Sequence, residues 1–153
     1  VGVPAELAKD RRTTLVASTA GIGFQLSSLP IGVERGWVTR AAAAERVRRT
    51  LEFFWNAPQG PDSVGATGYK GFYYHFLHPE SGLRFEKVEL STVDTALLLG
   101  GVLFCQSYFD RPDPDEAAVR ALADSIVRLD GVRLIRGGEQ RLQPEAAPVV
   151  RLP

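Results

Sequence analysis

Residues 91–108 read STVDTALLLGGVLFCQSY, and this stretch decides the fold. Ser91 and Asp94 match a capping box, in which a serine and an acidic residue three positions later cap the start of a helix. The residues that follow are apolar on nearly every side of a helix, so they leave no face for solvent. We therefore predict a helix that begins at Ser91, ends near Tyr108 and lies inside the protein.

Two further features of this helix concern its packing. Glycine inside a helix costs about 1 kcal/mol relative to alanine, so we expect Gly100 and Gly101 to allow close approach of another helix. Cys105 is the only cysteine and lies among apolar residues, which indicates a small core residue rather than a reactive thiol. The apolar run is much shorter than the roughly 20 residues that cross a bilayer, so we expect no membrane span.

Two helices are predicted before this one. Apolar residues recur at helical spacing over residues 14–34, and Pro30 should bend this helix because it lacks an amide hydrogen. Thr39 is suited to cap the next helix, which has charged residues on one face and apolar residues on the other. That apolar face consists of Ala44, Val47, Leu51, Phe54 and Trp55. Trp37 and Trp55 are interpreted as core anchors rather than exposed platforms for a ligand.

The segment between the second helix and residue 91 is predicted to contain a small β-hairpin. Prolines and glycines break any regular element over residues 56–69, which indicates a loop. The aromatic run 72–77 favours an extended strand. The turn-forming residues 78–82 would then return the chain along residues 83–88.

A fourth helix is predicted to begin at Asp113, because a cap, a proline and two acidic residues suit the exposed amides of a helix start. Its inward stripe is Val119, Leu122, Ile126 and Leu129. Residues 130–153 have scattered arginines and prolines without periodicity, so we expect an irregular, poorly ordered tail with one short strand at 132–135. The chain would then be one domain, 1–129, followed by this tail. Such a tail, in a chain without methionine, is typical of a fragment or of a truncated or frameshifted gene.

The composition argues against several classes of function. Lys and Arg total 18, as do Asp and Glu, so no basic excess is present to hold nucleic acid. The first residues show no signal peptide, which leaves a periplasmic and a cytoplasmic location open. No phosphate-binding glycine loop, nucleophile elbow or paired-cysteine motif occurs, so we expect no cofactor. His75 and His78 lack a third ligand, and we predict no metal site.

Three blocks of sequence occur in a distinctive order and spacing. They are Gly23-Phe24 with ERGW at 34–37, GFYYHF at 71–76, and ELSTVDTALL at 89–98. Together they resemble the glucoamylase-like family of glycoside hydrolases, which includes endo-β-1,2-glucanases and the related domain of cyclic β-1,2-glucan synthases. The resemblance extends from Ala17 to Leu129. It implies a mainly α chain that forms part of an (α/α)6 barrel, with about four helices and one small β-hairpin.

The resemblance also implies a function. The chain would be a fragment or truncated member of a glycoside hydrolase family that acts on β-glucan, with β-1,2-glucan as the expected substrate. Its partner would be an oligosaccharide or polysaccharide, and part of a barrel is expected to be inactive alone. The alternative is a non-catalytic helical module. Such a module would bind sugar or associate with itself, because helices that a complete barrel covers would be exposed.

Glycoside hydrolysis needs two carboxyl groups, one to protonate the leaving oxygen and one to activate water or attack the sugar. The resemblance points to Glu89 as one of them, in a cleft at one end of the barrel. The alternative is that Glu89 complements the helix dipole or a neighbouring cation, Arg84 or Lys87. Asp94 is a candidate residue of the substrate site, where it would fix the loop that presents Glu89. Its alternative role is capping of the helix alone.

Tyr73 and His75 are predicted to line the sugar site. They alternate along the strand with Phe72, Tyr74 and Phe76, so one set faces the core and the other is free to meet sugar. Tyrosine and histidine offer an apolar ring to the C–H surface of a sugar and a polar tip to its hydroxyls. Aromatic packing in the core is the alternative for each.

Overall fold

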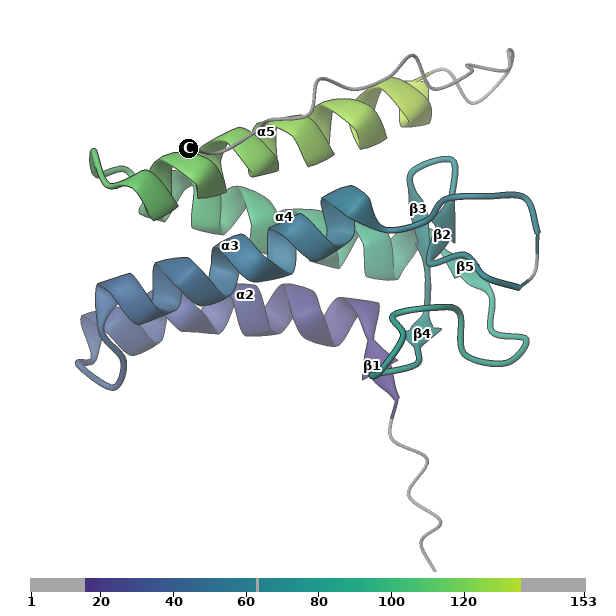
Figure 1. Cartoon of the computed structure of the whole chain (residues 1–153), viewed down its shortest axis with the longest axis horizontal. Coiled ribbons are helices and arrows are strands. Elements are labelled where there is room, and N and C mark those ends of the chain that lie inside the picture. The colour runs from purple at the N-terminus through teal and green to yellow at the C-terminus, as the bar shows by residue number, and fades with distance from the viewer. Residues whose placement is uncertain (1–15, 63, 136–153) are drawn as a thin grey trace, which may run out of the picture.

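The computed structural model describes residues 16–62 and 64–135. Within these ranges the chain has four helices: α2 (Thr19–Glu34), α3 (Arg40–Asn56), α4 (Thr92–Tyr108) and α5 (Pro114–Ile135). It also has five short strands: β1 (Ala17–Ser18), β2 (Gly68–Tyr69), β3 (Phe72–Tyr74), β4 (Phe76–Leu77) and β5 (Leu90–Ser91). Figure 1 shows the helices lying side by side and the strands gathered at one end of them. The prediction of a mainly α chain with four helices is confirmed.

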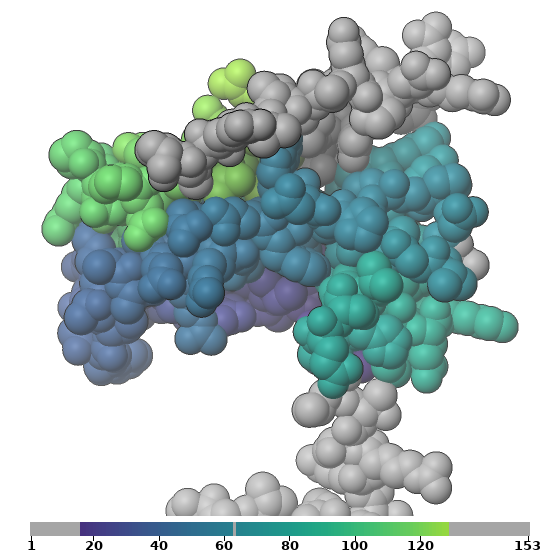
Figure 2. Space-filling view, in the orientation of Figure 1, coloured from purple at the N-terminus to yellow at the C-terminus, as the bar shows by residue number. Residues whose placement is uncertain are grey.

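The helices form two layers that share one core. The most extensive helix packing is that of α2 on α4, followed by that of α3 on α5. Ala20 contacts Asp94 at the starts of α2 and α4, and Glu34 contacts Tyr108 at their ends, so these two helices run in the same direction. All four helices contribute large core residues, among them Leu26, Leu51, Leu98 and Val119, and Phe109 joins them from the end of α4. In Figure 2, α3 and the strand region form one continuous surface on the face in view.

The α2/α4 contact is close because glycines meet there. A Cβ atom added at Gly101 would lie 2.3 Å from the carbonyl oxygen of Gly23, so no larger residue fits without movement of a backbone. Gly100, in contrast, faces open space. The expectation of close packing at the glycine pair is therefore confirmed for Gly101 and wrong for Gly100 within the described residues.

Cys105 of α4 compensates for a hydrogen bond that Pro30 removes from α2. Proline has no amide hydrogen to donate to the carbonyl four residues earlier, which leaves the Leu26 oxygen without its helical partner. The Cys105 thiol donates to that oxygen at 3.2 Å, and α2 continues unbroken to Glu34. Burial raises the pKa of the Cys105 thiol to about 12, as expected for a core cysteine rather than a reactive one.

The helix starts follow the predicted caps, with one correction. Thr39 caps α3 and Ser91 caps α4, each by accepting a hydrogen bond from an amide three residues later. The first helix begins at Thr19, later than predicted, because Ala17–Ser18 pairs with β4 as strand β1 and Ser18 supplies the cap. Residues 14 and 15 of the predicted helix lie outside the described ranges.

The predicted hairpin is present in part: Leu77 pairs with Arg84 across the predicted turn, and the Phe85 amide donates to the Phe76 carbonyl at 3.0 Å. The tight hairpin joins β2 to β3 through Lys70 and Gly71, whose φ angles of 53° and 85° suit a type I′ turn. The strand predicted over 72–77 breaks at His75, so β3 pairs with β2 and β5 whereas β4 pairs with β1. Residues 83–88 return beside β4 through one bridge, between Leu77 and Arg84.

Two surfaces also differ from expectation. Trp37 is 79% exposed in the turn between α2 and α3, so its interpretation as a core anchor is wrong, whereas Trp55 packs partly buried against the core. The α4 helix is not enclosed, because Leu97, Leu103 and Phe104 are exposed. Its apolar composition alone did not show that one stripe faces solvent in this chain.

The α5 helix passes through the region predicted to begin the tail. Residues 130–135 are helical, so the short strand expected at 132–135 is wrong. A single glycine such as Gly131 costs a helix about 1 kcal/mol and does not have to end it. The rest of the predicted tail, 136–153, and the side chain of Leu129 lie outside the part that the structure describes.

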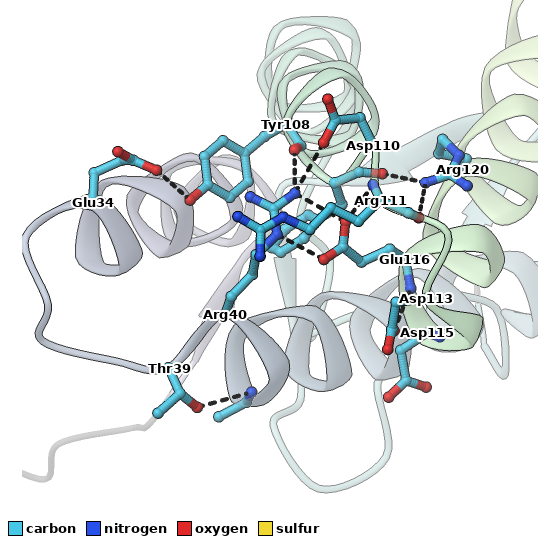
Figure 3. Close-up of polar contacts among 12 residues, drawn as sticks. Glu34, Thr39, Arg40, Tyr108, Asp110, Arg111, Asp113, Asp115, Glu116 and Arg120 are labelled. Atoms are coloured by element: carbon cyan, nitrogen blue, oxygen red, sulfur yellow. Dashed lines mark hydrogen bonds and ion pairs between the residues drawn. The ribbon is translucent and has the colours of Figure 1, made fainter.

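The ends of the helices far from the strands are joined by ionic contacts that we term the Arg40 clasp (Arg40, Glu116, Tyr108 and Asp110; Figure 3). Arg40 donates to both carboxylate oxygens of Glu116, at 2.7 and 2.9 Å, and to the carbonyl of Tyr108 at 2.8 Å. It also reaches Asp110 at 3.2 Å. Glu116 is 3% exposed, and its hydrogen bonds with Arg40 hold the pKa of its carboxyl below the usual range. The clasp ties the start of α3 to the end of α4 and the start of α5.

Replacement of Gly101 by alanine is expected to destabilise the protein by about 1–3 kcal/mol, because the added methyl group overpacks the α2/α4 contact. The matched variant Gly100→Ala should stabilise it by about 0.5–1 kcal/mol, since alanine favours helix and this position is open. Urea unfolding followed by circular dichroism measures both. Equal effects of the two substitutions would contradict the close contact.

The variant Glu116→Gln is expected to lose on the order of 3 kcal/mol at neutral pH, because it removes the buried carboxylate partner of Arg40 and leaves that charge only the exposed Asp110. The folded-state pKa of Glu116 is depressed, so its stabilisation is present above the unfolded value of about 4.3 and disappears as pH falls through the folded value. The difference in unfolding free energy between wild type and variant should therefore shrink below about pH 4. A difference independent of pH would show that the loss is not ionic.

Candidate functional site

Three of the residues predicted for the sugar site lie together at the end where α2 and α4 begin. We term them the His75 cluster (His75, Glu89 and Asp94). The Nδ1 atom of His75 lies 2.7 Å from Oε1 of Glu89, and its Nε2 atom lies 3.8 Å from Oδ1 of Asp94. Glu89 comes from the loop before β5, Asp94 from the first turn of α4, and His75 from the link between β3 and β4.

The backbone around His75 determines where its ring lies. Its amide donates to the carbonyl of Glu89 at 3.1 Å, and its own carbonyl accepts from the amide of Thr19 at 3.1 Å. The ring stacks on Phe76, with centroids 3.9 Å apart. His75 is therefore held between the start of α2 and the loop that carries Glu89.

Asp94 is the buried member of the cluster. Its Oδ2 atom accepts a short hydrogen bond from the Ser91 hydroxyl, and its Oδ1 atom accepts from the amide of Ala20 at 3.3 Å. The Ser91 hydroxyl in turn accepts from the Asp94 amide at 3.1 Å. Asp94 is 7% exposed, so it caps α4, joins the starts of both helices and shows little surface to a ligand.

Glu89 is the exposed member of the cluster. A hydrogen bond with its own backbone, and then one with His75, hold the pKa of its carboxyl below the usual range. Across residues 16–62 and 64–135, the ion pair of Glu89 is with His75 and not with Arg84 or Lys87. Arg84 instead donates to the carbonyl of Val88 at 2.8 Å. Glu89 is thus an ionised, accessible carboxylate at neutral pH.

Tyr73 does not join the cluster. It is 3% exposed, its hydroxyl donates to the carbonyl of Phe54 at 3.2 Å, and its ring meets the Phe54 ring edge to face. The predicted alternation of side chains requires a continuous strand, and the break at His75 ends it. Tyr73 and Tyr74 are consequently both buried.

The contact between His75 and Glu89 was not predicted. The register of β3 on β5 pairs Tyr73 with Ser91 and Tyr74 with Leu90. Continued by one residue, this register places His75 opposite Glu89. To predict this contact, one would have had to know that residues 72–74 pair with residues 90–91. The sequence instead indicated residues 83–88 as the partner strand.

The described residues hold no other candidate site of comparable chemistry. No group of three or more His, Cys, Asp or Glu in them is arranged to bind a metal ion. No helix in the described part is long and apolar enough to cross a membrane. An open hollow of about 430 Å³ lies at the end of α3, lined by Arg49, Phe53 and Pro58 among others, and includes no member of the His75 cluster.

Comparisons with known proteins identify the fold. No family model matches the chain, and no similar sequence is found among curated proteins. Among solved structures, the endo-β-1,2-glucanase of Chitinophaga pinensis in complex with sophorotriose and glucose has a TM-score of 0.68 and 22% identity, over 87% of this chain and 31% of that chain. A β-1,2-glucanase of Parabacteroides distasonis has a TM-score of 0.64 and 22% identity, over 75% and 16%. A candidate glucoamylase of Bacteroides uniformis ATCC 8492 has a TM-score of 0.67 and 24% identity, over 80% and 29%.

These similarities show that the chain has the fold of part of a glucoamylase-like helical barrel, as the sequence resemblance implied. The chain spans about a third or less of the length of these solved structures.

Proposed function

We propose that this chain is part of a glycoside hydrolase that acts on β-glucan, with β-1,2-glucan as substrate and Glu89 as one of two reacting carboxyl groups. The observation that carries the proposal is the contact between Glu89 and His75, which holds an exposed carboxylate at the end where two parallel helices begin. Two of the similar solved structures are β-1,2-glucanases, which supports the choice of substrate.

The pKa of Glu89 favours one of the two carboxyl roles. A general acid must be protonated before the reaction and needs a raised pKa, whereas a general base or nucleophile must be ionised. The lowered pKa of Glu89 suits the base or nucleophile. Asp94 has both oxygens engaged by Ser91 and Ala20, so the general acid would come from elsewhere in a complete barrel.

His75 is the residue of the cluster best suited to touch sugar along with Glu89. Its side chain is about one third exposed, and its ring is fixed by stacking on Phe76. Fixed polar groups bind sugar hydroxyls with little loss of side-chain entropy. Tyr73, buried in the core, has no part in this proposal.

Binding of sophorotriose, a β-1,2-linked trisaccharide, is expected to shift the amide signals of residues 75, 89 and 91 in a two-dimensional NMR spectrum. The variant Glu89→Gln should bind about tenfold more weakly, because one charged hydrogen-bond acceptor becomes neutral. The matched control is Glu86→Gln, which neutralises an exposed carboxylate of the same loop. Equal loss in both variants would count against Glu89.

Hydrolysis is tested with linear β-1,2-glucan by counting released reducing ends. We expect little release by the chain alone, and any release should disappear in Glu89→Gln and persist in Glu86→Gln. Release that survives Glu89→Gln would remove Glu89 from the catalytic role. Shifts confined to residues remote from the His75 cluster would place sugar binding elsewhere.

A second function, self-association, is favoured by one observation. Phe24 and Ile31 of α2 are 63% and 51% exposed, and Leu97 and Phe104 of α4 are 40% and 45% exposed. Each pair is seven residues apart, so each forms an apolar stripe along one side of its helix. We term these the α2 and α4 stripes. Exposed apolar stripes of this kind mark surfaces that other helices cover.

Sedimentation velocity from 10 µM to 1 mM protein is expected to show association if a second copy covers the stripes. The double variant Phe24→Ser, Phe104→Ser should remain monomeric over this range, because it removes apolar area from both stripes. Val64→Ser is the matched control, since Val64 is 84% exposed on a loop away from the helices. A wild-type protein that is monomeric throughout would contradict this function.

A further inference from the structure

His75 lies between two carboxylates that differ in how firmly they are held. One ring nitrogen faces Glu89 at 2.7 Å and the other faces Asp94 at 3.8 Å. The first contact is a hydrogen bond and the second is a longer polar contact, so the His75 ring lies between the two acids.

Asp94 is the anchored end of this bridge. Its carboxylate receives the Ser91 hydroxyl and the Ala20 amide, so its position is set by the starts of α4 and α2 together. Glu89 is the free end. Its side chain is exposed on a loop, and its contacts within the described residues are its own backbone and His75.

No other charged group of the described chain intervenes in the bridge. The first turn of α2 has no acidic residue and contributes the Ala20 amide, and the first turn of α4 contributes Asp94 as its acidic residue. The strand region contributes His75 and Glu89 themselves. The orientation of Glu89 thus depends on contacts that run from the two helix starts through Asp94 and His75.

We propose that Asp94 and His75 are positioning residues for Glu89, with Asp94 holding the His75 ring and the ring holding the Glu89 carboxylate in the geometry that the reaction needs. That this geometry serves catalysis rests on the proposed function. The geometry does not depend on that function, and its effect on the Glu89 pKa can be measured without substrate.

The test is the pKa of the Glu89 carboxyl, followed by 13C NMR titration of the side-chain carbon in wild type, His75→Gln and Asp94→Asn. The variant His75→Gln should raise this pKa towards its ordinary value, because it removes the imidazole that hydrogen-bonds with the carboxylate. Asp94→Asn should also raise it, to a smaller extent, because the ring loses its anchor.

The sign of the shift in Asp94→Asn distinguishes positioning from simple electrostatics. If Asp94 acted on Glu89 only as a nearby negative charge, its removal would lower the pKa of Glu89, since like charges raise the pKa of a carboxyl group. A lowered or unchanged pKa in Asp94→Asn would therefore overturn the proposal. Ser91→Ala, which loosens Asp94 but keeps its charge, should raise the Glu89 pKa and serves as the second variant if Asp94→Asn unfolds.

Asp113→Ala is the matched control, since alanine cannot accept the capping hydrogen bonds. Asp113 accepts from the amides of Asp115 and Glu116 at the start of α5, so this variant weakens a helix cap remote from the cluster. It should lower the melting temperature and leave the Glu89 pKa unchanged. A shift in this control as large as that in Asp94→Asn would show that the effect reports general loosening, and would overturn the proposal. If the Glu89 pKa shifts as expected but sophorotriose does not bind, the proposed function is contradicted and the positioning proposal stands.

Discussion

The close contact of α2 with α4 through Gly23 and Gly101 is the constraint on which the rest of the structure depends. The two backbones meet with no side chain between them, and the helices run in the same direction. Parallel helices bring their starts to one end of the molecule, so the amides of α2 come within reach of Asp94 on α4. A larger residue at either glycine would separate the helices and with them the parts of the His75 cluster.

The two ends of the helices are fixed by different kinds of interaction. At one end, Arg40 and Glu116 form a nearly buried ion pair that also engages backbone carbonyls and amides. At the other end, short strands and hydrogen bonds to helix starts hold His75, Asp94 and Glu89. The buried pair has its hydrogen bonds satisfied within the protein, as a structural contact requires. At the second end the Glu89 carboxylate is exposed and contacts the His75 ring.

The α2 and α4 stripes lie on helices whose fold is that of part of a larger helical barrel. The chain spans less than a third of the endo-β-1,2-glucanase of Chitinophaga pinensis, which has the same fold over that part. In a double ring of helices, an inner helix contacts protein on every side, and a helix at an open edge does not. Phe24 and Phe104 are exposed in the structure of this chain. Gly100 lies on the same helix as Phe104 and has open space beside it.

The sequence by itself determined the features that depend on near neighbours in the chain. The caps at Thr39 and Ser91, the number of helices and the buried faces of α3 and α5 follow from residue spacing, because a helix repeats every few residues. The resemblance selected Glu89, strand alternation selected His75 with Tyr73, and the capping box selected Asp94; the structure brings all of these together except Tyr73. Only the tertiary structure decided that His75 contacts Glu89, that Tyr73 is buried and that Trp37 is exposed. Those outcomes depend on which strands pair and which helix faces meet, and contacts between distant segments leave no periodic pattern in the sequence.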